Sequence, residues 1–214
     1  MELLELMGSQ VKYSFKYLMG TRFQLADGVA GQVRDVYFDD RTWEIRHLVT
    51  DPADRYSVSQ ILVPPTSVLP QGTFVIPELF LSLTKEQFAQ LPLASTVRPV
   101  CQQYSLWNTR GSGGRIDGGE RFDPHLRSCK TVQGYELMGP SEKEGVLDDF
   151  LIDTATWTVQ QLYGRTESAG SVHTFSFAPE AVSVIGWGAR MVRLKAPRRV
   201  VPPVRPAVSF VQAA

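Results

Sequence analysis

A carboxylate, a hydroxyl and an indole occur together twice in this chain, with the same spacing each time. The two sets are Asp39, Thr42 and Trp43 and, 114 residues further on, Asp153, Thr156 and Trp157. A carboxylate beside a hydroxyl can exchange protons with a substrate. Neither set comes with a nucleophile, a second base or the pattern of a cleft. We therefore interpret all six as structural residues of a turn and its core, and we predict no catalytic residue and no enzyme activity.

The turn itself follows from the residue types. The stretch Asp39-Asp40-Arg41-Thr42 separates two runs of alternating apolar residues and has the length of a tight hairpin loop built on a type I turn. An Asp at the first position accepts a hydrogen bond from the backbone two residues on, and Thr does so more weakly. A Trp that starts the returning strand then covers the open end of the core. Asp40 and Arg41 have no such role, and Thr154 and Ala155 replace them in the second set.

The turns belong to a longer internal repeat. Residues 14–68 align without a gap with residues 128–182, and 13 of the 55 aligned pairs are identical. The identical pairs are Ser14/Ser128, Lys16/Lys130, Gly20/Gly134, Gly31/Gly145, Asp35/Asp149, Asp39/Asp153, Thr42/Thr156, Trp43/Trp157, Leu48/Leu162, Ser57/Ser171, Val58/Val172, Pro65/Pro179 and Val68/Val182. The apolar positions keep their phase as well. Because a slip of one residue would turn a strand inside out, we infer a duplication.

Each copy is predicted to be β-structure. Residues 33–38 and 43–48 alternate along the chain and are rich in aromatic and β-branched side chains, which is typical of half-buried strands. A capping box of Thr84 and Gln87 starts a helix of about two turns, which Pro92 ends. The sequence therefore predicts an all-β fold with short helices.

The repeated pattern resembles the PRC-barrel domain. The resemblance lies in Gly31-Gln-Val33-Arg-Asp35, Asp39, Thr42-Trp43, Leu48-Val49, Val63-Pro64-Pro65 and Leu83-Thr-Lys-Glu-Gln87. The second copy, which opens at HLRSCKTVQGYEL, resembles the second half of bacterial proteins with two such domains in tandem. Together the two copies cover about two-thirds of the chain.

The resemblance implies two small, partly open β-barrels that act as docking modules. In the family, such a barrel forms the cytoplasmic domain of the photosynthetic reaction centre H subunit and the C-terminal domain of a ribosome maturation factor. In those settings it binds other proteins and performs no chemistry. We do not expect either role to carry over directly, because the sequence shows neither the pattern of the former's membrane helix nor that of the latter's N-terminal domain.

The composition is that of an ordinary soluble globular protein, with 43% hydrophobic and 21% charged residues. The formal net charge is zero, so no overall field gathers nucleic acid and we expect no nucleic-acid partner. The apolar runs are shorter than the roughly 18 residues that span a bilayer. Residues 1–10 carry acids where a signal peptide would carry Lys or Arg, so we expect a cytoplasmic protein without a membrane span.

The residues that bind metals or act as nucleophiles are few and scattered. Cys101 and Cys129 form no CxxC pair and have no His pair nearby, so we expect two reduced thiols and no zinc site. His47, His125 and His173 have no Ser or Cys partner at a spacing typical of a catalytic family, although proximity in space stays open. We predict no metal and no cofactor.

The repeat suggests a division into domains. We predict a first PRC-barrel domain over residues 12–93, a Gly-rich linker over 94–124, a second barrel over 125–196 and a basic, Pro-rich tail over 197–214. The glycines of the linker lack the Gly-Lys-Ser/Thr of a phosphate loop, so we interpret them as flexible chain.

The candidate interface residues lie in the linker and the tail. Tyr104 and Trp107 either pack into the groove between the barrels, which we favour, or anchor a partner. Arg198, Arg199 and Arg205 belong to a tail without acidic residues. This tail is solvated, straps against its own second barrel, or lies on an anionic surface.

These observations favour a non-enzymatic scaffold or adaptor that binds another protein, of unknown identity, through tandem PRC barrels. One alternative is a small-ligand-binding protein or enzyme with its site between the barrels, which polar groups from both copies around one deep pocket would support. Another is peripheral association with a photosynthetic or electron-transfer membrane complex. Half-open barrels have edge strands that invite pairing, so a homodimer is a further option.

Overall fold

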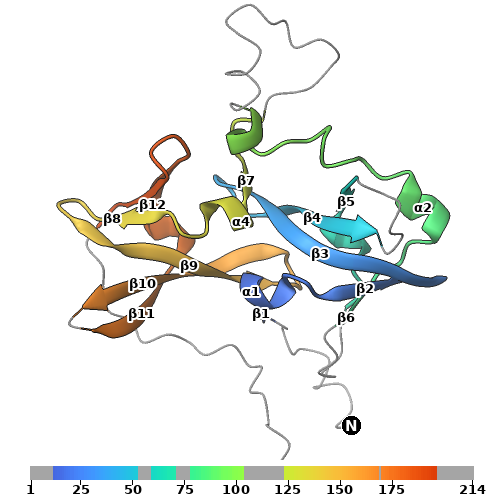
Figure 1. Ribbon diagram of the computed structural model, residues 1–214, viewed down its shortest axis with the longest axis horizontal. Coiled ribbons are helices and arrows are strands. Elements are labelled where there is room, and N and C mark those ends of the chain that lie inside the picture. The colour runs from blue at the N-terminus through green and yellow to red at the C-terminus, as the bar shows by residue number, and fades with distance from the viewer. Residues whose placement is uncertain (1–11, 53–58, 71–77, 104–122, 169, 197–214) are drawn as a thin grey trace, which may run out of the picture.

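The computed structural model describes residues 12–52, 59–70, 78–103, 123–168 and 170–196, with elements labelled as in Figure 1. In chain order they are β1 (Lys12–Ser14), α1 (Phe15–Leu18), β2 (Arg22–Leu25), β3 (Gly28–Asp39), β4 (Ile45–Pro52), β5 (Ile61–Val63), η2 (Pro65–Ser67), β6 (Glu78–Phe80), α2 (Lys85–Ala89), β7 (Leu126–Ser128), α4 (Cys129–Val132), β8 (Glu136–Met138), β9 (Lys143–Asp153), β10 (Thr158–Ser168), β11 (Ser171–Phe177), η3 (Pro179–Ala181), β12 (Val182–Gly186) and β13 (Met191–Leu194). The predicted all-β class with short helices is confirmed. None of the helices in these ranges is long and apolar enough to cross a membrane.

The strands form two sheets that follow the same order. One sheet runs β5-β4-β3-β2-β6, and the other runs β11-β10-β9-β8-β13-β12. In each sheet one pairing is parallel, between β2 and β6 and between β8 and β13. Figure 1 shows the sheets side by side, with the first half of the chain in blue to green and the second in yellow to red. Both sheets are open, since within the described residues the first and last strands of each sheet do not pair with each other.

The first strand of each half belongs to the sheet of the other half. β1 pairs with β9, which places Lys12 opposite Asp153, and β7 pairs with β3, which places Leu126 opposite Asp39. The register is the same in both cases, because each residue of the second pairing has its counterpart 114 residues away in the first. Such reciprocal contacts are those of a two-fold interface, here formed within one chain.

One hydrophobic core extends through both halves. Phe38 of β3 and Phe150 of β9 are fully buried, and their ring centroids are 5.6 Å apart. Phe15 of α1, from the first half, packs edge-on against Phe150 at 5.9 Å. Sheet and core membership therefore crosses the boundary between the two predicted domains, whose bounds stay a prediction.

β3 departs from the alternation of a half-buried strand. Val33, Val36 and Phe38 all belong to the main core, so the phase of the strand changes between residues 33 and 36. The register against β4 shifts between Val33 and Asp35, as a β-bulge produces. Asp35 and Tyr37 are buried as well. The prediction of a half-buried strand is wrong here. On the second face, Ser128 and Lys130 of the other half bind Asp35, and a small hydrophobic cluster with Ala94 and Leu126 buries Tyr37.

The predicted helix start at Thr84 is confirmed. The Thr84 side chain accepts a hydrogen bond from the Gln87 N–H, and the Gln87 side chain accepts one from the Thr84 N–H, which completes the capping box. The N–H of Lys85 also donates to the Asp27 carboxylate at 3.0 Å. This bond ties α2 to the β2–β3 turn.

Candidate functional site

The two Asp–Thr–Trp sets form the loops of the β3–β4 and β9–β10 hairpins. Asp39 Oδ1 accepts hydrogen bonds from the N–H groups of Arg41 and Thr42 at 2.9 and 3.2 Å. Asp153 Oδ1 forms the same two bonds, two and three residues on, at 2.8 and 3.4 Å. The Thr42 hydroxyl donates to the Glu44 carboxylate at 3.2 Å. These polar groups bind their own loops, which is a structural role.

Both tryptophans, Trp43 and Trp157, have a strained backbone conformation. Trp43 and Trp157 have φ values of 61° and 51°, in the left-handed region that costs energy for any residue with a Cβ. β4 begins at Ile45, so the prediction that Trp43 starts the returning strand is wrong. The conformation turns the Trp43 carbonyl to accept from the N–H of Val159 at 2.9 Å, and the Trp157 carbonyl to accept from Ile45 at 2.7 Å. Each loop thus joins the hairpin of the other half.

Two carboxylates hold the exchanged segments, the buried Asp35 and the half-buried Asp149. Asp35 Oδ2 accepts a hydrogen bond from Ser128 Oγ at 2.5 Å, and its Oδ1 accepts one from the N–H of Lys130 at 3.0 Å. Asp149 binds Ser14 Oγ and the N–H two residues later at 2.6 and 3.2 Å. Ser14 and Ser128 are the N-caps of α1 and α4. Each carboxylate therefore binds the N-cap of the other half's helix.

In the sequence, the residues that make these contacts stood out only because they are identical in the two copies of the repeat. Asp35/Asp149 and Ser14/Ser128 are among the 13 identical pairs. The repeat marks such residues, but a single sequence does not say whether an Asp of one copy bonds to the Ser of the same copy or of the other. The structure assigns each bond to the opposite half.

The buried Asp35 and the half-buried Asp149 make stability depend on pH. Burial raises the pKa of both Asp35 and Asp149 above the ordinary value of 3.8, against the opposing effect of their hydrogen bonds. The folded protein therefore keeps protons that the unfolded chain has already lost. The stability that these groups contribute is complete below about pH 3.8 and is lost as the pH rises through the raised folded values.

We expect the free energy of unfolding to fall less between acidic and neutral pH in the double variant D35N/D149N than in the wild type. The amide has no charge to desolvate, and it can still accept from the backbone N–H groups while donating to Ser Oγ. Urea unfolding at several pH values above about 4 measures the difference. Each single variant should remove part of it, and equal pH profiles for wild type and double variant would contradict the prediction.

The thiols and two of the histidines show no joint chemistry. Cys101 and Cys129 are both free thiols. Burial raises the pKa of the Cys129 thiol, which suppresses the reactive thiolate. Burial lowers the pKa of His47, whose Nδ1 is buried without a hydrogen-bond partner. His173 is exposed on β11. Within the described ranges no three His, Cys, Asp or Glu side chains cluster as metal ligands.

A cluster of Asp40, His125 and Arg127 also joins the two halves. Arg127 Nε of β7 donates to the Asp40 carboxylate at 2.6 Å, and His125 Nδ1 lies 2.8 Å from the same carboxylate. The Arg127 and Asp40 side chains are only 11% and 10% exposed. An Asp–His pair can orient a general base. Here Arg127 holds the carboxylate as well, so the cluster acts as a latch between the first loop and β7.

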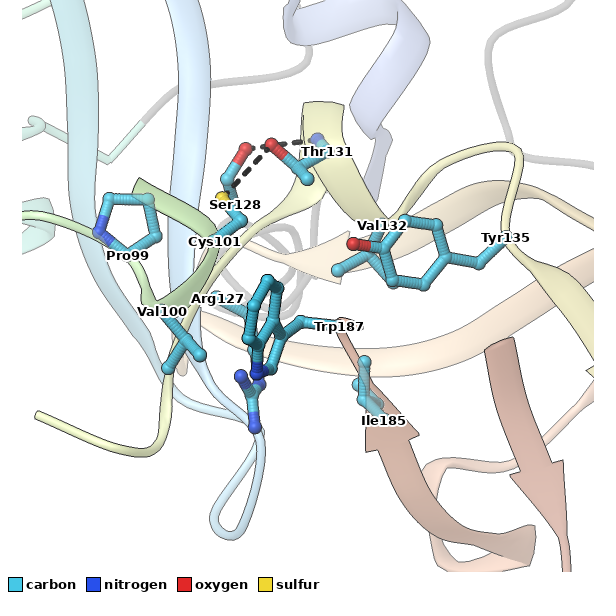
Figure 2. A pocket seen from close by; sticks show the side chains of 10 residues that line it. All are labelled: Pro99, Val100, Cys101, Arg127, Ser128, Thr131, Val132, Tyr135, Ile185 and Trp187. Atoms are coloured by element: carbon cyan, nitrogen blue, oxygen red, sulfur yellow. Dashed lines mark hydrogen bonds between the residues drawn. The ribbon is translucent and has the colours of Figure 1, made fainter. Parts of the chain in front are cut away.

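A small cavity lies next to this latch. Its volume is about 10 Å³, enough for one water molecule. Figure 2 shows the side chains around it, which come from the linker and the second half: Pro99, Val100, Cys101, Arg127, Ser128, Thr131, Val132, Tyr135, Ile185 and Trp187. The buried Arg127 Nη1 has no hydrogen-bond partner, and such a water would satisfy it.

A larger, open groove of about 460 Å³ lies on the first half. It is lined by Tyr37, Asp51, Ser59, Gln60, Ala94, Ser95, Arg98 and Gln102. All of these belong to the first copy or the linker. Neither hollow gathers polar groups from both copies, which is the arrangement that a ligand site between the barrels requires.

The candidate interface residues of the linker and tail fall outside the described residues. They are Tyr104, Trp107, Arg198, Arg199 and Arg205. Their roles stay predictions.

Comparison with known proteins adds no assignment. No protein-family model matches the chain. No curated protein matches it either.

Proposed function

We propose that this protein is a non-enzymatic scaffold that binds an extended segment of another protein at the start of the outer edge of β11, around Val172. The two halves act as partly open barrels of the PRC type that arose by duplication. This proposal is supported by the equal strand order of the two sheets and by the 13 identities at a constant separation. The polar clusters described above serve structural roles, which fits a scaffold.

The observation that carries the proposal is the exposed, uncharged edge of β11. This strand is the first in the order of its sheet and pairs, among the described strands, with β10 alone. Residues 171–174 are all exposed, and Val172 is 57% exposed. Natural edge strands are usually protected by Lys, Pro or a bulge. The sequence of β11, SVHTFSF, contains no Lys and no Pro.

The side chains around this edge define the chemistry of the partner. Val172 lies opposite Glu167 and Thr174 opposite Arg165, so the exposed Val172 is flanked by one acid and one base on the same face. Backbone groups of an added strand supply affinity, and alternate side chains supply specificity. The partner segment is therefore extended, with β-branched or apolar residues at alternate positions and charges of both signs beside them.

The test compares two matched substitutions. Val172→Lys places a charge on the β11 edge, whereas Val184→Lys places the same charge on β12, where Val184 is 47% exposed. β12 is the opposite edge of the same sheet. Tagged wild type and both variants are purified from the native host, and stoichiometric partners are identified by mass spectrometry. We expect wild type and V184K to retain one partner and V172K to lose it, with an affinity at least about tenfold lower.

Three results would count against this function. No stoichiometric partner for the wild type would contradict a scaffold. Retention by V172K would place the contact elsewhere. A wild-type dimer that dissociates in V172K alone would make a second copy of this chain the partner of the edge.

A further inference from the structure

In the first half, residues 92–94 cover the edge strand β5. The N–H of Leu62 donates to the Pro92 carbonyl at 2.9 Å, and the N–H of Ala94 donates to the Gln60 carbonyl at 2.8 Å. Residues 92–94 thus lie beside β5, with Leu93 in an isolated antiparallel β-bridge to Ile61. The outer backbone groups of this edge are satisfied by the chain itself.

The same segment also seals a small hydrophobic cluster. Ala94 is buried with Tyr37 and Leu62, and Val97 packs against them from outside. The covering segment therefore contains three residues with distinct roles. The Pro92 carbonyl accepts a hydrogen bond from β5, Ala94 is buried, and Val97 packs over the cluster.

In the second half, the corresponding edge belongs to β11. Thr174 and Ser176 occupy the positions of Gln60 and Leu62, because Thr174 lies opposite Arg165 and Ser176 opposite Tyr163 in the register that β4 and β5 share. No strand within the described residues pairs with the outer side of β11. Ser176 is nevertheless only 2% exposed.

The tail repeats the sequence of the covering segment. Residues 91–97 read LPLASTV and residues 205–211 read RPAVSFV. Pro92, Ser95 and Val97 are matched by Pro206, Ser209 and Val211 at the separation of 114 that relates the two halves. These three identical pairs lie beyond residue 182, where the main alignment ends.

We propose that residues 206–208 bind along the base of β11 as residues 92–94 bind along β5. The N–H of Ser176 donates to the Pro206 carbonyl, and the N–H of Val208 donates to the Thr174 carbonyl. The Val208 side chain takes the place of Ala94 and packs against Leu151, the buried counterpart of Tyr37.

The length of the tail is sufficient for this path. β13 ends at Leu194, twelve residues before Pro206. An extended chain of that length spans about 40 Å. In the first half α2 occupies the corresponding stretch. The sequence has Pro202 and Pro203 at this point, and prolines favour an extended chain over a helix. The tail occupies residues 174–176, and the scaffold function rests on Val172 at the tip, so either proposal can fail alone.

Amide hydrogen exchange of the full chain tests the strap. The Ser176 amide is followed by NMR in the wild type, in a chain that ends at residue 204, and in the full-length variant Val208→Asp. We expect the Ser176 amide to exchange at least about tenfold faster in both altered chains. The Leu62 amide, its counterpart under residues 92–94, is the internal control and should not change. A peptide of residues 203–212 should slow the exchange of the shortened chain again.

The outcomes are decisive in both directions. Equal exchange of Ser176 in the three chains, whether fast or slow, overturns the proposal, because the tail would then have no contact there. Protection of Ser176 in the shortened chain that rises with protein concentration also overturns it, since a second copy would then cover the edge.

Discussion

Expressed as separate fragments, residues 1–103 and 123–214 are each expected to lack a stable monomeric fold, and to form one folded 1:1 complex when mixed. The reason is the exchange of β1 and β7. Each fragment alone carries a strand and a helix whose sheet is in the other fragment. Each also has an empty place in its own sheet, beside β3 or β9.

Each isolated fragment is expected to lose most of its stability, because its strand pairing, its polar contacts and its core all depend on the interface with the other fragment. Without β7 and α4, Asp35 loses two of its hydrogen bonds and is left as a poorly satisfied carboxylate. Phe38 loses its contact with Phe150 in the shared core. Leaving buried polar groups unpaired and core rings exposed costs several kcal/mol, comparable with the whole stability of a small domain of about 5 to 15 kcal/mol.

Circular dichroism and sedimentation of the single and mixed fragments measure this prediction. The control is the full chain with a protease site in place of residues 108–113, cut after folding. The covalent break is then similar, but the halves have never been apart, so the nicked protein should melt close to the intact one. A folded monomer of either fragment would contradict the prediction and show that the predicted domains are independent.

The local structure followed from the sequence because its causes are local. The Asp at the start of each hairpin loop and the Thr84 capping box act over two or three residues, and the repeat gave the elements of the second half from those of the first. The bulge in β3 was not predictable in this way. It is set by the need to bury Val33 and Val36 in one core and Asp35 under the other half.

The exchange of strands could not be read from the sequence because the repeat is ambiguous about it. A copy that keeps its own first strand and a copy that exchanges it contain the same pairs, Ser14 with an Asp and Asp35 with a Ser. The choice depends on chain geometry. Only three residues separate α1 from β2, so β1 and α1 are short of chain to fold back across their own sheet.

Replacing Trp43 by Ala is expected to lower the free energy of unfolding by about 3 kcal/mol, at the lower end of the range for large aromatic truncations because the side chain is half-buried. The indole stacks on Phe38 with ring centroids 5.5 Å apart and planes 13° apart. Its removal leaves that buried ring uncovered. Trp157→Ala should have a similar effect, since Trp157 packs against the same core.

Trp43→Gly separates the ring from the backbone. Both variants lose the indole, but Gly adopts the φ of 61° without the strain that Ala suffers there. We therefore expect W43G to be about 1 kcal/mol more stable than W43A, the reverse of the usual order of these residues in strands and helices. Urea unfolding of the wild type and both variants measures the difference. If W43A unfolds like the wild type, Trp43 contributes no packing and becomes a candidate binding residue. If W43G is the less stable variant, the positive φ at residue 43 does not strain an Ala there, and the prediction is wrong.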